Sequence, residues 1–261
     1  MNTSANSPTE RPFEIVEGEA AAGVLFICDH ASNAIAPELA GLGLSQRDLS
    51  RHIAYDIGAA EVTRALAGLF GAPAVLSRFS RLVIDPNRGA DDPTLAMRIS
   101  DGAIIPGNAT IDEAEIERRR EAYWRPYREA VGGAIAEMIA HGPVPGVVSI
   151  HSFTPTWRGA ARPWQAAALW DRDPRIAQPV IAALRAAGMT VGDTLYDLAT
   201  KQGLAHVLIE VRQDLVGAAE GAQAMAETIA QALRPVLADP DTHIVRHYGS
   251  RAGLRHTGHR P

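Results

Sequence analysis

Apolar residues follow two spacings along the chain, and each spacing predicts one kind of element. Short continuous apolar runs bounded by turn residues predict buried strands, and they lie at 23–28, 74–77, 82–85, 147–150, 166–170 and 206–211, with a weaker one at 189–192. Longer stretches in which apolar residues recur every three to four positions predict helices, and they lie at 44–70, 111–141, 173–187 and 218–237. Strands and helices therefore alternate along the chain.

Local signals support the predicted helix boundaries. In the helix at 44–70, Ser45 can cap the first turn, and the apolar stripe consists of Leu49, Ile53, Ile57 and Ala60. Pro126 is expected to kink the second helix, because proline lacks the N–H that an interior helical position needs. Gly188 is expected to end the third helix, since glycine readily adopts the left-handed conformation found there.

The alternation of elements predicts the fold class. The central strands are apolar on both faces, which is typical of a sheet covered by helices on both sides. We expect a three-layer α/β/α fold with a mostly parallel or mixed central sheet. One domain is expected over residues 21–240, preceded by a disordered lead at 1–20 and followed by a flexible tail at 241–261 that is rich in His and Arg.

Composition excludes several classes of protein. The chain of 261 residues has a net charge of −5 that is spread along its length, which does not match the basic surface of a nucleic-acid binder. No apolar run approaches the roughly 20 residues that span a bilayer, and the N-terminus does not resemble a signal peptide. The chain has a single cysteine, Cys28, which excludes an internal disulfide and fits a cytoplasmic location. The pattern leaves both a monomer and a homo-oligomer open.

Polar side chains gather where four of the predicted strands end. His30 follows the first strand, Asn87 and Arg88 follow the run at 82–85, His151 follows the run at 147–150, and Glu210 lies in the last strand. Ligands of open parallel sheets bind beyond the carboxyl ends of the strands. Two histidines with one carboxylate are the usual ligands of a hydrolytic zinc ion, which keeps one position open for water. We therefore expect His30 and His151 to bind Zn²⁺.

The third metal ligand is less clear from the sequence. Asn33 lies three residues after His30, but an amide is a poor ligand for zinc. Asp56 shares a predicted helix face with His52, four residues before it. An exposed His52–Asp56 pair is the alternative, but Asp56 is preferred because the site otherwise lacks an anionic ligand.

Glu210 lies within an apolar strand, where an idle carboxylate is unfavourable. One interpretation is an ion pair with Arg212, which lies two residues further on the same face of the strand. The preferred interpretation is a general base whose pKa is raised by burial. Arg212 itself is a further candidate for substrate binding.

The segment that contains Asn87 and Arg88 is rich in guanidinium groups. A guanidinium can bind a carboxylate through two parallel hydrogen bonds, so Arg88, with Asn87 beside it, is a candidate clamp for a substrate carboxylate. Arg78 or Arg81 could polarise the scissile carbonyl, although either could equally be a surface charge. Ser152 lacks the Gly-x-Ser-x-Gly motif of a serine hydrolase.

Taken together, the motifs resemble those of the N-formylglutamate amidohydrolase family. They cover about residues 24–237 and are Cys-Asp-His-Ala-Ser-Asn, Tyr-Asp-Ile-Gly-Ala, Ser-Arg-Leu-Val-Ile-Asp-Pro-Asn-Arg, His-Ser-Phe-Thr-Pro and Leu-Ile-Glu-Val-Arg-Gln-Asp-Leu. The resemblance implies a phosphorylase/hydrolase-like sheet and one catalytic zinc, as in the zinc carboxypeptidases and aspartoacylases. It also implies hydrolysis of N-formyl-L-glutamate to formate and glutamate, a step of histidine degradation.

The resemblance also implies roles for individual residues. The order of motifs in the carboxypeptidases is met by His30, Arg81, Asn87 with Arg88, His151 with Ser152, and Glu210. A Glu is expected at the position of Asn33, and this departure is why Asp56 is the predicted carboxylate ligand. Arg81 would stabilise the oxyanion. Two alternatives stay open, namely a deacylase of another N-acyl amino acid and a carboxylate-binding protein without catalysis.

Overall fold

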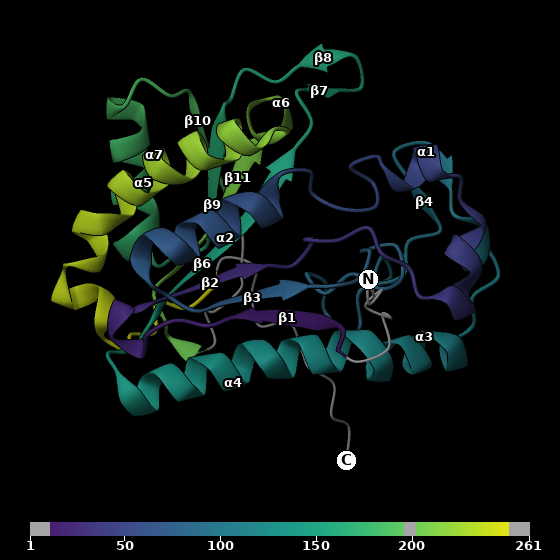
Figure 1. The fold of residues 1–261 in the computed structure, drawn as a ribbon, viewed down its shortest axis with the longest axis horizontal. Coiled ribbons are helices and arrows are strands. Elements are labelled where there is room, and N and C mark those ends of the chain that lie inside the picture. Colours follow the sequence, from purple (N-terminus) through teal and green to yellow (C-terminus); the bar gives the residue numbers. More distant parts are fainter. Residues whose placement is uncertain (1–10, 196–201, 251–261) are drawn as a thin grey trace, which may run out of the picture.

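The computed structural model describes residues 11–195 and 202–250. Within them a mixed sheet of seven strands has the order β1-β3-β2-β6-β11-β9-β10 (Figure 1). Strands β3, β2, β6 and β11 are parallel to one another, whereas β1, β9 and β10 run in the opposite direction. The strand bounds are Phe13–Val16 (β1), Val24–Cys28 (β2), Ala74–Ser77 (β3), Gly146–Phe153 (β6), Ala166–Trp170 (β9), Val191–Leu195 (β10) and His206–Arg212 (β11).

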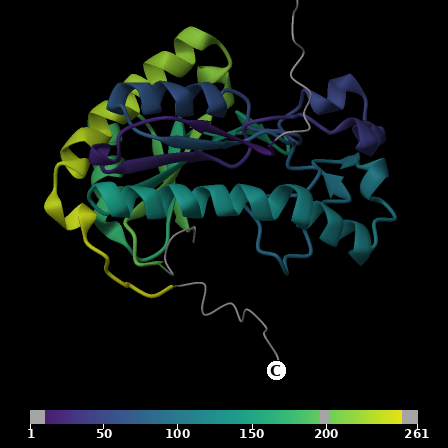
Figure 2. The ribbon, with the colours of Figure 1, turned by 60° about the horizontal axis from the view of Figure 1, so that its bottom comes forward.

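Helices cover both faces of this sheet. Helices α2 (Ala59–Phe70), α5 (Pro174–Ala186) and α7 (Ala219–Leu237) pack on one face, and α4 (Arg125–His141) packs on the other (Figure 2). The predicted three-layer α/β/α architecture is therefore confirmed. None of the helices in the described part of the chain has the length and apolarity to cross a membrane.

The smaller elements lie around this frame. The short helices are α1 (Gln46–Leu49), α3 (Glu113–Arg119) and α6 (Gln213–Val216), and the 3₁₀ turns are η1 (Ala20–Ala22), η2 (Pro37–Gly43), η3 (Pro106–Asn108) and η6 (Pro240–His243). Two ribbons are formed by β4 (Ile99–Ser100) with β5 (Ala103–Ile104) and by β7 (Thr156–Trp157) with β8 (Ala160–Ala161).

The alternation of side chains along β2 explains why this strand is apolar throughout. Val24, Phe26 and Cys28 belong to the core beneath α2, α5 and α7. Leu25 and Ile27 point the other way, into the core beneath α4. Successive side chains of a strand point to opposite faces, so a strand covered on both sides needs apolar residues at every position.

The predicted helix at 44–70 is wrong, because the structure divides it into α1 and α2. The nine residues between them turn back toward the sheet, where the Asp56 N–H donates to His30 O (2.9 Å). Gly58 then starts α2 with a φ of +80°, and a Cβ there would lie 2.3 Å from Val216 O. Asp56 therefore lies in a loop, and the shared helix face with His52 does not exist.

The predicted strand at 82–85 is also wrong, although Leu82, Val83 and Ile84 are fully buried. Side chains satisfy its backbone in place of a neighbouring strand. Asn108 Nδ2 donates to Leu82 O (2.8 Å), and Arg119 Nη1 donates to Val83 O (3.0 Å). An apolar run indicates that a segment is buried, and here the buried segment is a turn and not a strand.

The long helical segment at 111–141 contains a wide turn. Residues Arg120–Trp124 (η4) form a π-helical turn between α3 and α4, in which the Arg125 N–H donates to Arg120 O. Pro126 follows at the start of α4, where its missing N–H leaves no broken hydrogen bond. The irregularity expected at Pro126 thus lies one turn earlier.

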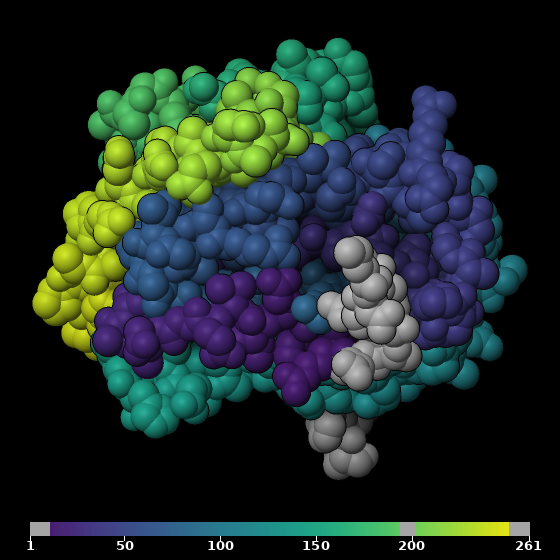
Figure 3. Space-filling view, in the orientation of Figure 1, coloured from purple at the N-terminus to yellow at the C-terminus, as the bar shows by residue number. Residues whose placement is uncertain are grey.

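Parts of both expected terminal segments belong to the described residues. The described part of the expected lead contains β1, which pairs antiparallel with β3 and lies at the surface between α2 and α4 (Figure 3). Within the expected tail, the His243 ring contacts Val144 O (2.9 Å) and Leu237 O (2.8 Å). Residues 1–10 and 251–261 lie outside the described residues.

Candidate active site

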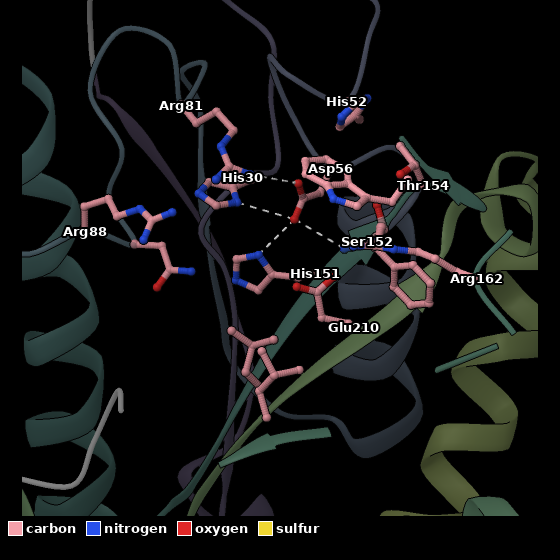
Figure 4. Close-up of a pocket in the computed structure, with 15 residues that line it drawn as sticks. His30, His52, Asp56, Arg81, Arg88, His151, Ser152, Thr154, Arg162 and Glu210 are labelled. Atoms are coloured by element: carbon pink, nitrogen blue, oxygen red, sulfur yellow. Dashed lines mark hydrogen bonds and ion pairs between the residues drawn. The ribbon is translucent and has the colours of Figure 1, made fainter. Parts of the chain in front are cut away.

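A pocket of about 300 Å³ opens at the carboxyl ends of β2, β6 and β11. His30 lies just after β2, whereas His151 and Glu210 are paired neighbours in β6 and β11. Asp56 enters from the loop before α2 (Figure 4). Parallel strands bring these residues together because their carboxyl ends lie at one edge of the sheet.

His30, Asp56 and His151 form a buried cluster at the bottom of the pocket. One ligand atom from each lies within 4.8 Å of the others. Asp56 Oδ2 is 2.8 Å from His151 Nδ1 and 3.4 Å from His30 Nδ1. The side chains are 2–5 % exposed. All three are thus shielded from solvent and face a common point.

Two further carboxylates lie behind the histidines. His30 Nε2 is 2.7 Å from Asp85 Oδ1, and His151 Nε2 is 3.0 Å from Asp29 Oδ2. The Tyr127 hydroxyl also donates to Asp29 (3.0 Å). A carboxylate on the far nitrogen fixes the tautomer and orientation of a metal-binding imidazole. Each Nδ1 is thereby directed at the cluster.

The chemistry of these atoms suits a cation. If each imidazole donates its Nε2–H to the carboxylate behind it, both Nδ1 atoms are acceptors, and they face a third acceptor, Asp56 Oδ2. Without a cation, burial lowers the pKa of His151, but Asp29 and Asp56 outweigh this effect and raise it to about 10. His30, Asp56 and His151 can therefore hold a metal ion.

The Asp56 carboxylate is tied down on its other sides. The Ser152 N–H donates to Oδ2 (3.2 Å), and Arg81 Nη1 donates to Oδ1 (3.4 Å). Arg81 Nη2 also donates to Asp85 (3.0 Å). Burial alone would raise the pKa of Asp56, but His30 and His151 hold it well below its usual range. Asp56 is therefore an anion at neutral pH.

Glu210 differs from the other carboxylates of the site. Among the described residues, no hydrogen bond or ion pair engages its carboxylate. Its register partner on β9 is the small Ala167, and Glu210 lines the pocket. Burial raises the pKa of Glu210, and Asp56 adds to this rise. These properties suit a group that takes up and releases a proton.

Asn87 and Arg88 lie on one wall of the pocket. The Asn87 backbone N–H donates to Asp85 Oδ1 (2.9 Å), which links this wall to the partner of His30. The Arg88 side chain is 43 % exposed, and its Nε lies 3.7 Å from Asp85 Oδ2. Arg88 thus reaches the pocket from solvent and keeps most of its donors available.

The sequence profile of the N-formylglutamate amidohydrolase family matches residues 22–217. The match covers the pocket from His30 to Glu210 and most of the sheet. The chain belongs to this family.

Two solved structures share the fold of this chain. The gene product Atu2144 of Agrobacterium tumefaciens is 36% identical with a TM-score of 0.80, over 87% of this chain and 95% of that chain. An N-formylglutamate amidohydrolase from Ralstonia eutropha JMP134 is 20% identical with a TM-score of 0.61, over 87% of this chain and 98% of that chain. No curated protein sequence matches the chain.

In this member of the N-formylglutamate amidohydrolase family, most of the site residues expected from the sequence line one pocket. They are His30, Asp56, Arg81, Asn87, Arg88, His151 and Glu210. Arg212 is absent from the pocket lining, since its guanidinium donates to Asp214 (2.7 and 3.2 Å) and to backbone carbonyls. Asn33 donates to Leu49 O (2.9 Å) instead of facing the cluster.

Sequence reasoning missed two groups of residues in the site. Asp29 and Asp85 stand beside predicted site residues in the sequence, and this adjacency was the available signal. Arg162 and Trp157 line the opposite wall from the ribbon of β7 and β8. The ribbon follows the end of β6 in the sequence, but no pattern within it predicts that Arg162 and Trp157 reach the pocket.

Proposed function

We propose that this chain is a zinc-dependent amidohydrolase that converts N-formyl-L-glutamate to formate and glutamate. The observation that carries the proposal is the cluster of His30, His151 and Asp56, with Glu210 and three guanidinium groups in the same pocket. A zinc ion held by the cluster would activate water and stabilise charge on the carbonyl oxygen. The family match supports an amide as the bond that is cleaved.

Glu210 is the general base and then the general acid of the proposed reaction. Its carboxylate accepts a proton as water attacks the formyl carbon, and it returns this proton to the departing amine nitrogen. Burial raises its pKa, which favours both tasks because the group must be basic enough to take the proton and acidic enough to return it.

Arg88 and Asn87 bind a carboxylate of the substrate, and this positions the amide over the cluster. Arg81 remains a proposed stabiliser of the oxyanion. It lines the pocket, although two of its nitrogens already contact Asp56 and Asp85. Its first task is therefore to hold these two carboxylates in place.

The proposed setting of the reaction is the cytoplasm, which suits the buried free thiol of Cys28. A role in histidine degradation, implied by the sequence resemblance, stays a prediction. The proposed partner is a small acidic N-acyl amino acid.

A panel of substrates tests the proposal. We expect the purified protein with added zinc to release formate from N-formyl-L-glutamate with a higher kcat/KM than it shows for N-acetyl-L-glutamate, N-formyl-L-aspartate or N-formyl-L-methionine. Removal of the metal with a chelator should abolish turnover, and zinc should restore it. Preference for another acyl group or amino acid would favour the alternative deacylase. Binding of glutamate without bound metal or turnover would favour a binding protein.

A further inference from the structure

Three guanidinium groups line the pocket, and they differ in what they already contact. Arg81 donates to Asp56 and Asp85, so its charge is balanced within the protein. Arg88 approaches a single carboxylate, at 3.7 Å. Arg162 forms no ion pair with a carboxylate of the described residues. The capacity to bind an anion from outside therefore rises from Arg81 to Arg88 to Arg162.

Aromatic rings hold Arg162 in place. Its guanidinium carbon lies 5.0 Å from the centroid of Phe153 and 5.6 Å from that of Trp157. Its backbone N–H donates to Pro155 O (2.8 Å), at the base of the β7–β8 ribbon. A guanidinium held against ring faces keeps its N–H donors at the edge of its plane, where a carboxylate can bind two of them.

Arg88 and Arg162 lie on opposite sides of the buried cluster. In Figure 4, Arg88 stands at one side of His30, Asp56 and His151, whereas Arg162 stands at the other side. Both side chains belong to the lining of the same pocket. A ligand that engages both guanidinium groups thus extends across the cluster and carries two separated anionic groups.

We propose that Arg162 is a specificity-determining residue that binds the side-chain carboxylate of a dicarboxylic N-acyl amino acid, while Arg88 and Asn87 bind its α-carboxylate. The assignment of the two carboxylates follows from their reach. The α-carboxylate is one carbon from the scissile nitrogen and suits Arg88, which is linked through Asp85 to His30. The side-chain carboxylate lies further from the scissile nitrogen and suits Arg162, beside the β7–β8 ribbon. This inference rests on the proposed amidohydrolase function for the identity of the ligand.

Equilibrium binding to the zinc-loaded protein tests the inference without turnover. Calorimetry would compare L-glutamate, the proposed product, with L-glutamine, which lacks the side-chain charge. Loss of a charge-assisted hydrogen-bond pair weakens binding by about tenfold to a hundredfold. We expect Arg162→Gln to weaken glutamate binding by this factor and to change glutamine binding by less than about threefold.

Two further variants make the test specific. Arg158→Gln is the matched control, because Arg158 lies on the same ribbon and also contacts Trp157 (5.7 Å), yet it is outside the pocket lining. It should leave both affinities unchanged. Arg162→Lys keeps the charge but loses the planar pair of donors, so its glutamate affinity should fall between those of the wild type and Arg162→Gln. The lysine variant also decides the matter if the glutamine variant does not fold.

Hydrolysis of N-formyl-L-glutamate and N-formyl-L-glutamine by the same proteins separates the two proposals. Suppose that Arg162→Gln loses the binding preference for glutamate over glutamine, while none of the proteins cleaves either formyl compound. The assignment of Arg162 to the side-chain carboxylate is then supported, and the proposed activity is wrong. If the wild type cleaves N-formyl-L-glutamate and Arg162→Gln keeps the wild-type preference for glutamate over glutamine, the assignment of Arg162 is wrong. Equal losses for both ligands, or no binding of glutamate by the wild type, would also overturn it.

Discussion

The floor and the rim of the pocket are built in different ways. We use floor for His30, Asp56 and His151 with Asp29 and Asp85 behind them, and rim for Arg88 and Arg162. Side chains of the floor are at most 5 % exposed, and each contacts at least two other polar groups. At the rim, the Arg88 side chain is 43 % exposed, and Arg162 rests on aromatic rings.

This difference separates chemistry from selectivity. A polar network in which each member is held by several others fixes its atoms closely, which a metal ion requires of its ligands. The guanidinium groups of the rim have few ionic partners within the protein, so their N–H donors are available to a ligand. We therefore expect changes in the floor to affect metal binding and turnover for every substrate, and changes in the rim to alter the choice of substrate.

The largest effect is expected from removal of a histidine of the floor. His151→Ala should lose bound zinc and all detectable turnover, because two ligands remain and the Asp29 and Asp56 carboxylates lose the group between them. Elemental analysis and a formate assay measure both losses. His206→Ala is the matched control, since His206 is a buried imidazole at the other end of β11. Stoichiometric zinc in the His151 variant would contradict the metal assignment.

Glu210→Gln should lower kcat by about a hundredfold or more, because glutamine keeps the shape but cannot accept a proton. Bound zinc and the melting temperature should change little, since the proposed ligands are untouched. Glu220→Gln, at an exposed carboxylate of α7, provides the control and should be fully active. A folded, zinc-loaded Glu210→Gln protein with nearly normal kcat would end the proposed mechanism.

The pH dependence of the wild type supplies a second measurement on Glu210. Burial raises its pKa, so the protonated, inactive form persists to a higher pH than for an ordinary glutamate. Turnover should therefore fall as the pH is lowered through this raised value, and Glu210→Gln should lack that acidic limb. An unchanged limb in the residual activity of the variant would assign it to another group.

A smaller effect is expected from the carboxylates behind the histidines. Asp29→Asn keeps the shape but removes the charge that orients His151, so zinc affinity should fall by about tenfold to a hundredfold. Competition with a chelating dye would measure the change. Asp173→Asn, at a buried carboxylate bound to Arg175 away from the pocket, is the control for the cost of the substitution itself. Equal zinc affinity in Asp29→Asn and the wild type would show that His151 needs no such orientation.

The sequence was sufficient to predict the layers of the fold and most of the floor. Apolar runs located β2, β3, β6, β9 and β11, because a strand covered on both faces must be apolar throughout. Since the ends of parallel strands meet, the polar residues that follow them also indicated a common site. His30, His151 and Glu210 could be proposed on this ground alone.

Other features depend on contacts between distant segments, which periodicity does not report. Asp56 was proposed from a helix that does not exist. Its position results from hydrogen bonds of its loop with the backbone of His30 and with the Ser80 side chain, which donates to Ala54 O (2.8 Å). Arg212 was proposed because it follows Glu210, but its nearer partner is Asp214. Arg162 escaped notice because only the folded ribbon brings it to the pocket.

The smallest effect is expected at the rim, from Arg88→Lys. Lysine keeps the positive charge but offers no planar pair of donors, and the exposed position of Arg88 gives its replacement room to adjust. We expect kcat/KM for N-formyl-L-glutamate to fall by roughly tenfold, which is the size of one lost charge-assisted hydrogen bond. The fall should be smaller for the analogue in which the α-carboxylate is an amide, because that group gains less from a paired guanidinium.

Arg78→Lys, at an exposed arginine outside the pocket lining, should change neither value. Equal losses for both substrates would mean that Arg88 supports the pocket wall through Asp85 and does not bind the carboxylate. Arg88 would then belong to the floor of the pocket and not to its rim.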